Sequence, residues 1–167
     1  MAPTMTYVGL DVHARSTHAA AVDVRSGELR RARFGGGVAE PLAWILSLPG
    51  PVHACYEAGP TGYVLYWQLT QMGVACEVIA PSLIPTKAGD RVKTDRRDAE
   101  KLVRCYRVGE LTPVWVPDAD HEALRDLVRA REAAKKDQLR HRHRLGKFLL
   151  RHGKRPTGRE KPGHGST

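Results

Sequence analysis

The chain has 167 residues, 41% of them hydrophobic, which suits one domain with a buried core and an appendage. Its formal net charge is +9, an excess of positive charge that favours a polyanionic partner. There is no apolar run of transmembrane length, no signal-peptide pattern and no CxxC pair among the three cysteines, so the sequence argues against a membrane protein, a disulfide-rich secreted protein or a zinc module, and favours a cytoplasmic setting.

The first third of the chain predicts an antiparallel meander of three strands. Residues 6–12 are an apolar run with the carboxylate of Asp11 near its end, and residues 18–24 form a second run. After a turn, residues 28–34 alternate well enough for a third strand. Residues 38–48 are spaced like a helix, which Pro-Gly-Pro ends.

The middle of the chain predicts strand–helix–strand units. The expected elements are a strand at 52–56, a helix at 61–72, a strand at 75–80, an irregular basic segment at 82–93 and a helix at 95–108. Thr61 and Thr94 are the expected N-caps of the two helices, and Val64, Leu65 and Leu69 are expected to face inward. This order favours an α/β fold with a mixed five-stranded sheet and helices on both faces.

A long basic helix is expected after a proline-containing connector, beginning at Asp118 or Asp120 and ending before Gly153. Residues 1–123 hold 13 Lys and Arg against 14 Asp and Glu, whereas residues 124–155 hold 12 against 3. The narrow apolar stripe is typical of an arm or a coiled-coil strand rather than a core helix. We therefore divide the chain into a domain at 5–117, a basic helical arm at 118–153 and a disordered tail at 154–167.

Four acidic residues are expected to converge. Asp11 lies near the end of the first strand, and Glu57 directly follows the fourth. Parallel neighbouring strands place such ends side by side, where open α/β sheets build their sites. Asp95 and Asp98 begin a helix three residues apart and so share a face, roughly 5 Å apart.

Such a cluster predicts a metal centre. Four carboxylates repel one another and need a counter-ion, and Mg²⁺ or Mn²⁺ is the natural one because both take oxygen ligands. Two such ions can activate an attacking oxygen and stabilise the leaving oxygen of a phosphodiester. Each acid alone has an ordinary structural explanation, such as a turn residue or a helix N-terminus, and only their joint placement favours nuclease or polynucleotidyl transferase chemistry.

Three sequence blocks carry a family resemblance. GLDVH at 9–13, YEAGPTGY at 56–63 and KTDRRDAEKL at 93–102 closely resemble the signature blocks of the DEDD transposases of bacterial insertion sequences, which are bridge-RNA-guided recombinases. The resemblance covers roughly residues 5–153 and implies a RuvC-like, ribonuclease H-like catalytic domain. It also implies a bacterial, nucleoid-associated protein that acts in DNA transposition and recombination.

The resemblance also assigns roles. It implies that Asp11, Glu57, Asp95 and Asp98 are the catalytic, metal-binding set, with Mg²⁺ or Mn²⁺ as cofactor. It implies that the arm, at about 119–152, contacts guide RNA and forms a homo-oligomer. The family continues into a second domain with a serine nucleophile, which nothing in residues 154–167 resembles, so we expect a fragment or a truncated gene product that binds metal but does not complete strand exchange, and we name no nucleophile.

Basic side chains beside the acids and along the arm are the candidate nucleic-acid contacts. They are Lys87, Arg91, Lys93, Arg96, Arg97, Arg129, Lys135, Lys136, Arg140, Arg142, Arg144 and Lys147. Two other functions stay open: a stand-alone nuclease that resembles a Holliday-junction resolvase, and a non-catalytic nucleic-acid-binding or dimerisation fragment. An actin-like ATPase is excluded because no Gly/Thr-rich phosphate loop follows the first strand.

Overall fold

The computed structural model describes residues 4–86 and 94–155, which form two compact units, residues up to Val116 and residues from Pro117 onward. The elements of the first unit are β1 (Thr6–Val12), β2 (Ser16–Asp23), β3 (Leu29–Gly35), α1 (Ala39–Leu46), β4 (Val52–Glu57), α2 (Val64–Gln71), β5 (Ala75–Ile79), η1 (Pro81–Leu83) and α3 (Asp95–Arg107). Helix α4 (Ala119–Arg151) makes up the second unit.

The five strands form one mixed sheet in the order β3-β2-β1-β4-β5. β1, β2 and β3 are an antiparallel meander, whereas β4 and β5 run parallel to β1. The predicted mixed five-stranded sheet with flanking helices is confirmed. One outer strand, β5, is covered by the segment that follows α3, where Val114 N donates to Val78 O, and the other outer strand is β3.

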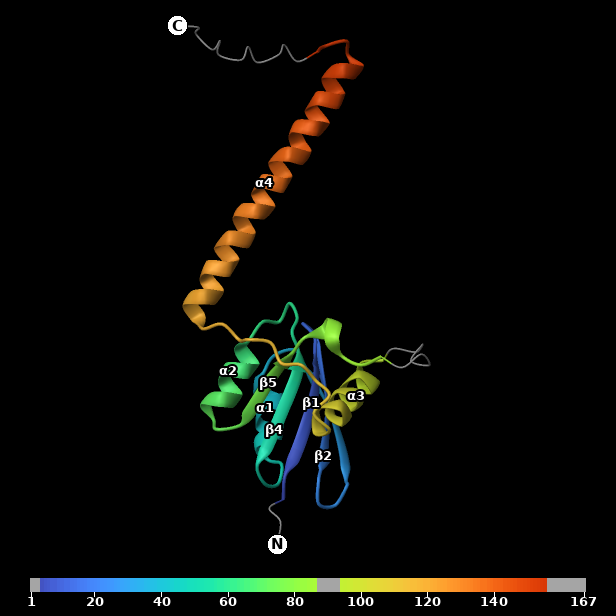
Figure 1. The fold of residues 1–167 in the computed structure, drawn as a ribbon, viewed down its shortest axis with the longest axis vertical. Coiled ribbons are helices and arrows are strands. Elements are labelled where there is room, and N and C mark those ends of the chain that lie inside the picture. Colours follow the sequence, from blue (N-terminus) through green and yellow to red (C-terminus); the bar gives the residue numbers. More distant parts are fainter. Residues whose placement is uncertain (1–3, 87–93, 156–167) are drawn as a thin grey trace, which may run out of the picture. The chain divides into compact units, whose positions relative to one another are not determined.

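Alternate residues of each strand supply two separate cores. Val8 and Leu10 of β1 pack with Leu42, Ile45 and other residues of α1 and α2 on one face. On the other face, α3 packs against β1, β2 and β4 through small clusters centred on Ala99, Leu102 and Val103. Figure 1 shows α3 on the opposite side of the sheet from α1 and α2. The period of two along a strand therefore decides which residues face α3.

Gly9 is the point where α3 comes closest to the sheet. A Cβ built on Gly9 would lie 2.5 Å from Val103 N and 2.6 Å from Ala99 O, both of them backbone atoms of α3. Only a residue without a side chain permits this approach. Gly9 thus sets the depth at which α3, and the acids at its beginning, lie over the sheet.

Helix α2 differs from the prediction. It begins at Val64 with Tyr63 as N-cap and no side-chain capping bond, so Thr61 does not cap it. Leu65 and Leu69 are buried as predicted, but Val64 is 47% exposed, so its predicted inward position is wrong. At about 100° per residue, Val64 lies about 100° from Leu65 and about 140° from Leu69, outside the buried face.

Helix α4 begins where expected. The side chain of Asp118 accepts a hydrogen bond from His121 N at 2.8 Å, which caps the first turn. None of its residues, all of which the structure describes, is buried. Seven apolar side chains of this helix are 47% to 68% exposed: Leu124, Leu127, Val128, Leu139, Leu145, Phe148 and Leu150. No helix in the described part of the chain combines the length and the hydrophobicity of a membrane span.

Candidate metal centre

Three strands bring polar residues together in one row. The antiparallel register sets Asp11 of β1 opposite His18 of β2. The parallel register pairs Leu10 with Tyr56, which places Glu57 next to Asp11 at the ends of β1 and β4. Neighbouring strands lie about 4.8 Å apart, so the three side chains are adjacent on one face. Helix α3 covers that face. Gly9, Ala20 and Cys55, which contact α3, stand two residues from Asp11, His18 and Glu57 on the same strands and therefore share their face.

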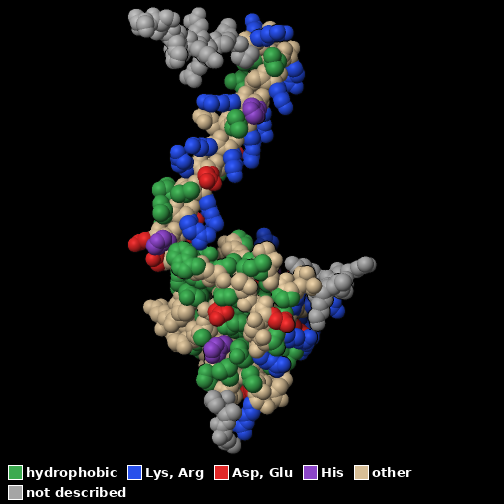
Figure 2. All heavy atoms as spheres, viewed as in Figure 1, with side chains coloured by type: hydrophobic (Ala, Val, Ile, Leu, Met, Phe, Trp, Pro, Cys, Tyr) green, Lys and Arg blue, Asp and Glu red, His purple; other side chains and the backbone are tan. Residues whose placement is uncertain are grey.

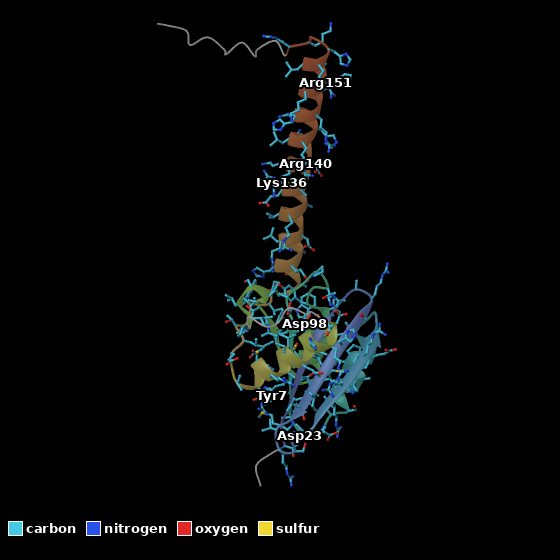
Figure 3. All side chains as sticks on the ribbon, turned by 90° about the vertical axis from the view of Figure 1, so that its right-hand side faces the viewer. Tyr7, Asp23, Asp98, Lys136, Arg140 and Arg151 are labelled. Carbon is cyan, nitrogen blue, oxygen red and sulfur yellow. The ribbon has the colours of Figure 1, made fainter. Side chains whose placement is uncertain are left out.

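The first turn of α3 adds the remaining acids. Thr94 accepts a hydrogen bond from Arg97 N at 3.4 Å and caps the helix, as predicted. Asp95 and Asp98 both lie in that turn, where the positive end of the helix dipole favours carboxylates. Asp95 Oδ2 is 3.6 Å from His18 Nδ1, which ties the turn to the row on the sheet. Figure 3 shows Asp98 on α3, at the opposite end of the unit from Asp23.

Asp11 is the most buried of the four acids, with a side chain that is 12% exposed. Burial raises the pKa of its carboxyl group, the nearby His13 ring lowers it, and the charges of Asp95 and Asp98 raise it again. The net direction is upward from 3.8. The charges of Asp95 and Asp98 in α3 therefore act on the carboxylate of Asp11 in the sheet.

The donor atoms fit a divalent cation. One donor atom each from Asp11, His18 and Asp95 lie within 4.8 Å of one another. Adjacent ligand atoms of an octahedral Mg²⁺ lie about 3 Å apart and opposite ones about 4.2 Å apart, so small side-chain rotations suffice for a shared ion. Glu57 and Asp98 offer further oxygen donors from the next strand and the same helical turn.

Sequence reasoning missed His18. The second strand was expected to begin at this residue, whereas β2 begins at Ser16, and His13 N donates to Ser16 O across the turn. Those two additional residues place His18 directly opposite Asp11. His13, also outside the predicted set, has Nε2 3.1 Å from Asp11 Oδ2. The alternation of His18 with Ala20 and Val22 was the only signal in the sequence that could have placed it on this face.

Glu100 links α3 to the outer strand β3 of the sheet. Arg31 of β3 donates to Glu100 Oε1 at 2.6 Å, and Arg96 donates to the same oxygen at 3.3 Å. The Glu100 side chain is only 16% exposed. The hydrogen bond from Arg31 is the main cause that lowers the pKa of Glu100 below 4.5.

We expect Glu100→Gln to lower the free energy of unfolding by about 1 kcal/mol at pH 7, after allowance for solvent around Arg31. A lowered folded-state pKa contributes stability above pH 4.5 that is lost as the pH falls, so the difference from the native chain should shrink in acid. Urea unfolding at pH 7 and below pH 4.5 measures the difference in the free energy of unfolding. Glu28→Gln, which removes an exposed ion pair with Arg30, is the control and should change little; an equal loss in both variants would contradict the special role of Glu100.

The candidate nucleic-acid contacts divide into three groups. Lys87, Arg91 and Lys93 lie outside the described residues. Arg96 pairs with Glu100 on α3, and Arg97 lies beside it, exposed. The remaining seven are exposed on α4, where Arg140 also pairs with Asp137: Arg129, Lys135, Lys136, Arg140, Arg142, Arg144 and Lys147. Figure 2 shows basic side chains along the length of α4.

The strand order β3-β2-β1-β4-β5, with β1 to β3 antiparallel and β4 and β5 parallel to β1, is that of a ribonuclease H-like fold. The chain belongs to the IS110 family of DEDD transposases, whose sequence profile matches residues 8–153. The predicted family is therefore confirmed.

Individual relatives agree. The chain is 49% identical over 155 residues to the proposed transposase y4qE of Sinorhizobium fredii, covering 89% of this chain and 39% of that protein. It is 40% identical over 152 residues to the transposase for insertion sequence element IS1533 of Leptospira borgpetersenii, covering 87% and 43%. The chain thus spans about two fifths of the length of these curated relatives.

Among solved structures, RuvC of Thermus thermophilus aligns with a TM-score of 0.40 at 13% identity, covering 66% of this chain and all of that one. A Ppx/GppA family protein of Aquifex aeolicus aligns with a TM-score of 0.29 at 14% identity, covering 47% of this chain and 36% of that one. The family assignment rests on the sequence matches and not on these two likenesses.

Proposed function

We propose that the chain is the metal-binding catalytic domain of a DNA transposase, and that it acts in metal-dependent DNA strand cleavage and transfer. One observation carries the proposal: Asp11 of β1 and Asp95 in the first turn of α3 offer donor atoms that lie, with one of His18, within 4.8 Å of one another, and Glu57 ends the neighbouring strand β4. The names of the relatives, both transposases, support DNA as the substrate. We extend the same proposal to the domain limits, a catalytic domain at 5–117 and an arm at 118–153, and to a bacterial cytoplasmic, nucleoid-associated location.

Asp11, Glu57, Asp95 and Asp98 are the proposed metal ligands. When bound, Mg²⁺ or Mn²⁺ supplies an activated attacking oxygen and a stabilised leaving oxygen. The chain contributes the position of the carboxylates: β1 and β4 hold two of them in register, and the capped first turn of α3 holds the other two. Arg96 and Arg97 in that same turn are proposed to hold DNA phosphates near the acids, as are Lys87, Arg91 and Lys93.

The test of this function offers the chain a four-way DNA junction and a linear duplex, with and without Mn²⁺. We expect the metal to increase DNA binding or nicking, and Asp98→Asn to remove that increase. Glu110→Gln is the matched control, since Glu110 is an exposed acid beyond the other end of α3. DNA binding that neither Mn²⁺ nor Asp98→Asn changes would contradict the proposal. Efficient cleavage of the junction by the chain alone would favour a resolvase-like nuclease.

The arm is proposed to bind structured guide RNA and to form a homo-oligomer. At about 100° per residue, Arg129, Lys136, Arg140 and Lys147 fall within about 40° of one another around α4. Leu124, Leu127, Val128 and Leu145 fall at about 180° to 280° from Lys136, in a sector that also holds Arg131, Lys135 and Arg142, and Leu139 lies between the two sectors. The basic stripe supports a nucleic acid on one side, and the leucine-rich sector, which also holds three basic side chains, supports a second copy of the helix on the other. Figure 3 shows Lys136, Arg140 and Arg151 at successive levels of α4.

We expect the triple change of Arg129, Lys136 and Lys147 to Gln to weaken RNA binding and to reduce the salt slope of log K by about 0.7 for each lost phosphate contact. The comparison triple, Arg131, Lys135 and Arg142 to Gln, removes the same charge from the leucine-rich sector, and we expect it to reduce the slope less, although Lys135 and Arg142 are also candidate contacts. Fluorescence anisotropy with a structured RNA at several salt concentrations measures both. Equal slopes for the two triples would show that total charge, and not the stripe, governs binding.

A further inference from the structure

His18 lies in the row of polar residues that also holds Asp11 and Glu57, and the four acids alone do not explain why a histidine stands there. It faces Asp11 across the β1–β2 pair and is enclosed by α3, with a side chain that is 17% exposed. Its ring therefore lies between the sheet and the first turn of the helix that carries Asp95 and Asp98. A histidine placed only for packing would turn its polar atoms toward solvent or toward a hydrogen-bond partner.

The Nδ1 atom of His18 does neither. Within the described residues it is buried without a hydrogen-bond partner, the one side-chain polar atom in that condition. The nearest acceptor, Asp95 Oδ2, is 3.6 Å away, which is too far for a hydrogen bond. A buried polar atom without a hydrogen bond destabilises the folded state, so a ligand that uses His18 Nδ1 removes that cost.

We propose that His18 is a nitrogen ligand of the divalent cation, bound through Nδ1 beside Asp11 and Asp95. The inference rests on the proposed metal function and deepens it, because it adds a fifth residue, from β2, to the four acids. The three donor atoms already lie within 4.8 Å of one another. A separation of 3.6 Å between Nδ1 and Oδ2 is too long for a direct bond but close to that of two adjacent ligands of one ion.

His13 is the competing histidine and fits less well. Its side chain is 54% exposed, and its Nε2 already lies at hydrogen-bond distance from Asp11 Oδ2. His13 thus has both solvent and a hydrogen-bond partner, whereas His18 Nδ1 has neither solvent nor a hydrogen bond. The geometry assigns the ligand role to His18 and leaves His13 as a neighbour of the carboxylate.

A nitrogen ligand changes which ion the site prefers. Mg²⁺ favours oxygen ligands, whereas imidazole suits later divalent metals, and affinities rise from Mn²⁺ to Co²⁺ in nitrogen-containing sites. The site should therefore bind Mn²⁺ and Co²⁺ more tightly than Mg²⁺. His18→Asn places an amide oxygen near the position of Nδ1, so this variant should keep Mg²⁺ binding and lose the preference.

The experiment loads the intact chain with Mn²⁺ and records pulsed electron paramagnetic resonance, which detects a nitrogen bonded directly to the ion. We expect a nitrogen coupling in the native chain that disappears in His18→Asn and persists in His13→Asn. His53→Asn is the matched control, because His53 lies on β4 against Tyr7 and outside the cluster. Calorimetry should show Mn²⁺ binding at least about tenfold weaker in His18→Asn, in line with the loss seen when metal-site partners are removed.

The outcomes separate the two proposals. If the native chain binds Mn²⁺ without a nitrogen coupling, the role of His18 is wrong and the four-acid site stands; this result needs no variant to fold. A coupling that survives His18→Asn but disappears in His13→Asn also overturns the inference. If the native chain binds neither Mn²⁺ nor Mg²⁺, the metal function itself fails and His18 fails with it.

Discussion

Asp11→Asn is expected to abolish the rise in melting temperature that Mn²⁺ or Mg²⁺ gives the native chain. Asp11 is the central residue of the row, flanked by His18 on β2 and Glu57 on β4. An amide retains the shape of the carboxyl group but not its charge, and hard cations depend on that charge. Thermal unfolding with increasing metal concentration measures the effect, since a ligand that binds only the folded state stabilises it by about 2.7 kcal/mol at a hundred times its Kd.

The same substitution should raise the melting temperature of the metal-free protein. Burial and the charges of Asp95 and Asp98 raise the folded-state pKa of Asp11, so the folded state binds a proton more readily than the unfolded state does. Stability of the metal-free chain therefore falls as the pH rises through the interval between 3.8 and the raised pKa, and the ionised carboxylate is a cost at neutral pH. Asn removes that cost, and we expect a gain of a few degrees, or about 1 kcal/mol or less.

Asp23→Asn is the control for both effects. Asp23 is an acid at the opposite end of the sheet, where it accepts hydrogen bonds from Arg25 N and Ser26 N (Figure 3). Its loss should lower stability slightly and leave the response to metal intact. If metal raised the melting temperature of Asp11→Asn as much as that of the native chain, Asp11 would not be a metal ligand.

Gly9→Ala is expected to have the second largest effect, on stability and on metal binding together. The new Cβ would lie 2.5 Å and 2.6 Å from two backbone atoms of α3, which cannot rotate away as a side chain could. The helix must move as a body, and overpacking of this kind costs about 1–3 kcal/mol, or on the order of 10 °C in a domain of this size. Asp95 and Asp98 move with the helix, so Mn²⁺ affinity should fall as well.

Gly35→Ala tests whether this effect belongs to the contact with α3. Gly35 ends β3, and a Cβ there meets nothing within 4 Å. Thermal unfolding and Mn²⁺ titration of the two variants should differ clearly, with Gly35→Ala close to the native chain. If Gly9→Ala also left stability and Mn²⁺ affinity unchanged, the close approach of α3 to the sheet would not depend on glycine at position 9.

The features predicted correctly from sequence are those that depend on short-range pattern. The apolar run that contains Asp11 and the Thr94 cap of α3 specify a strand and a helix start without reference to the rest of the chain. The capped turn with Asp95 and Asp98 could be placed over the sheet because strand order limits where a helix can pack. The positions of the four acids followed from these local elements.

The features that were missed depend on register and on contacts distant in sequence. His18 lies opposite Asp11 only because the hairpin turn ends at Ser16, and a shift of one residue would have turned the ring to the other face. The bond between Arg31 and Glu100 joins residues 69 positions apart, which no periodic pattern reveals. Apolar spacing likewise placed Val64 in a helix without showing that its first turn is exposed.

Within residues 4–86 and 94–155, no segment pairs with the outer side of β3, and this has a consequence for aggregation. A free outer strand offers unpaired backbone groups to any other extended chain, and proteins commonly block such strands with charge. Arg30, Arg31 and Arg33 are all exposed along β3, so a second copy approaching edge to edge would align like charges. Exposed arginines on β3, Arg33 above all because Arg30 and Arg31 have acidic partners, disfavour edge-to-edge pairing of two sheets, whereas Val114 and its neighbours occupy the outer side of β5.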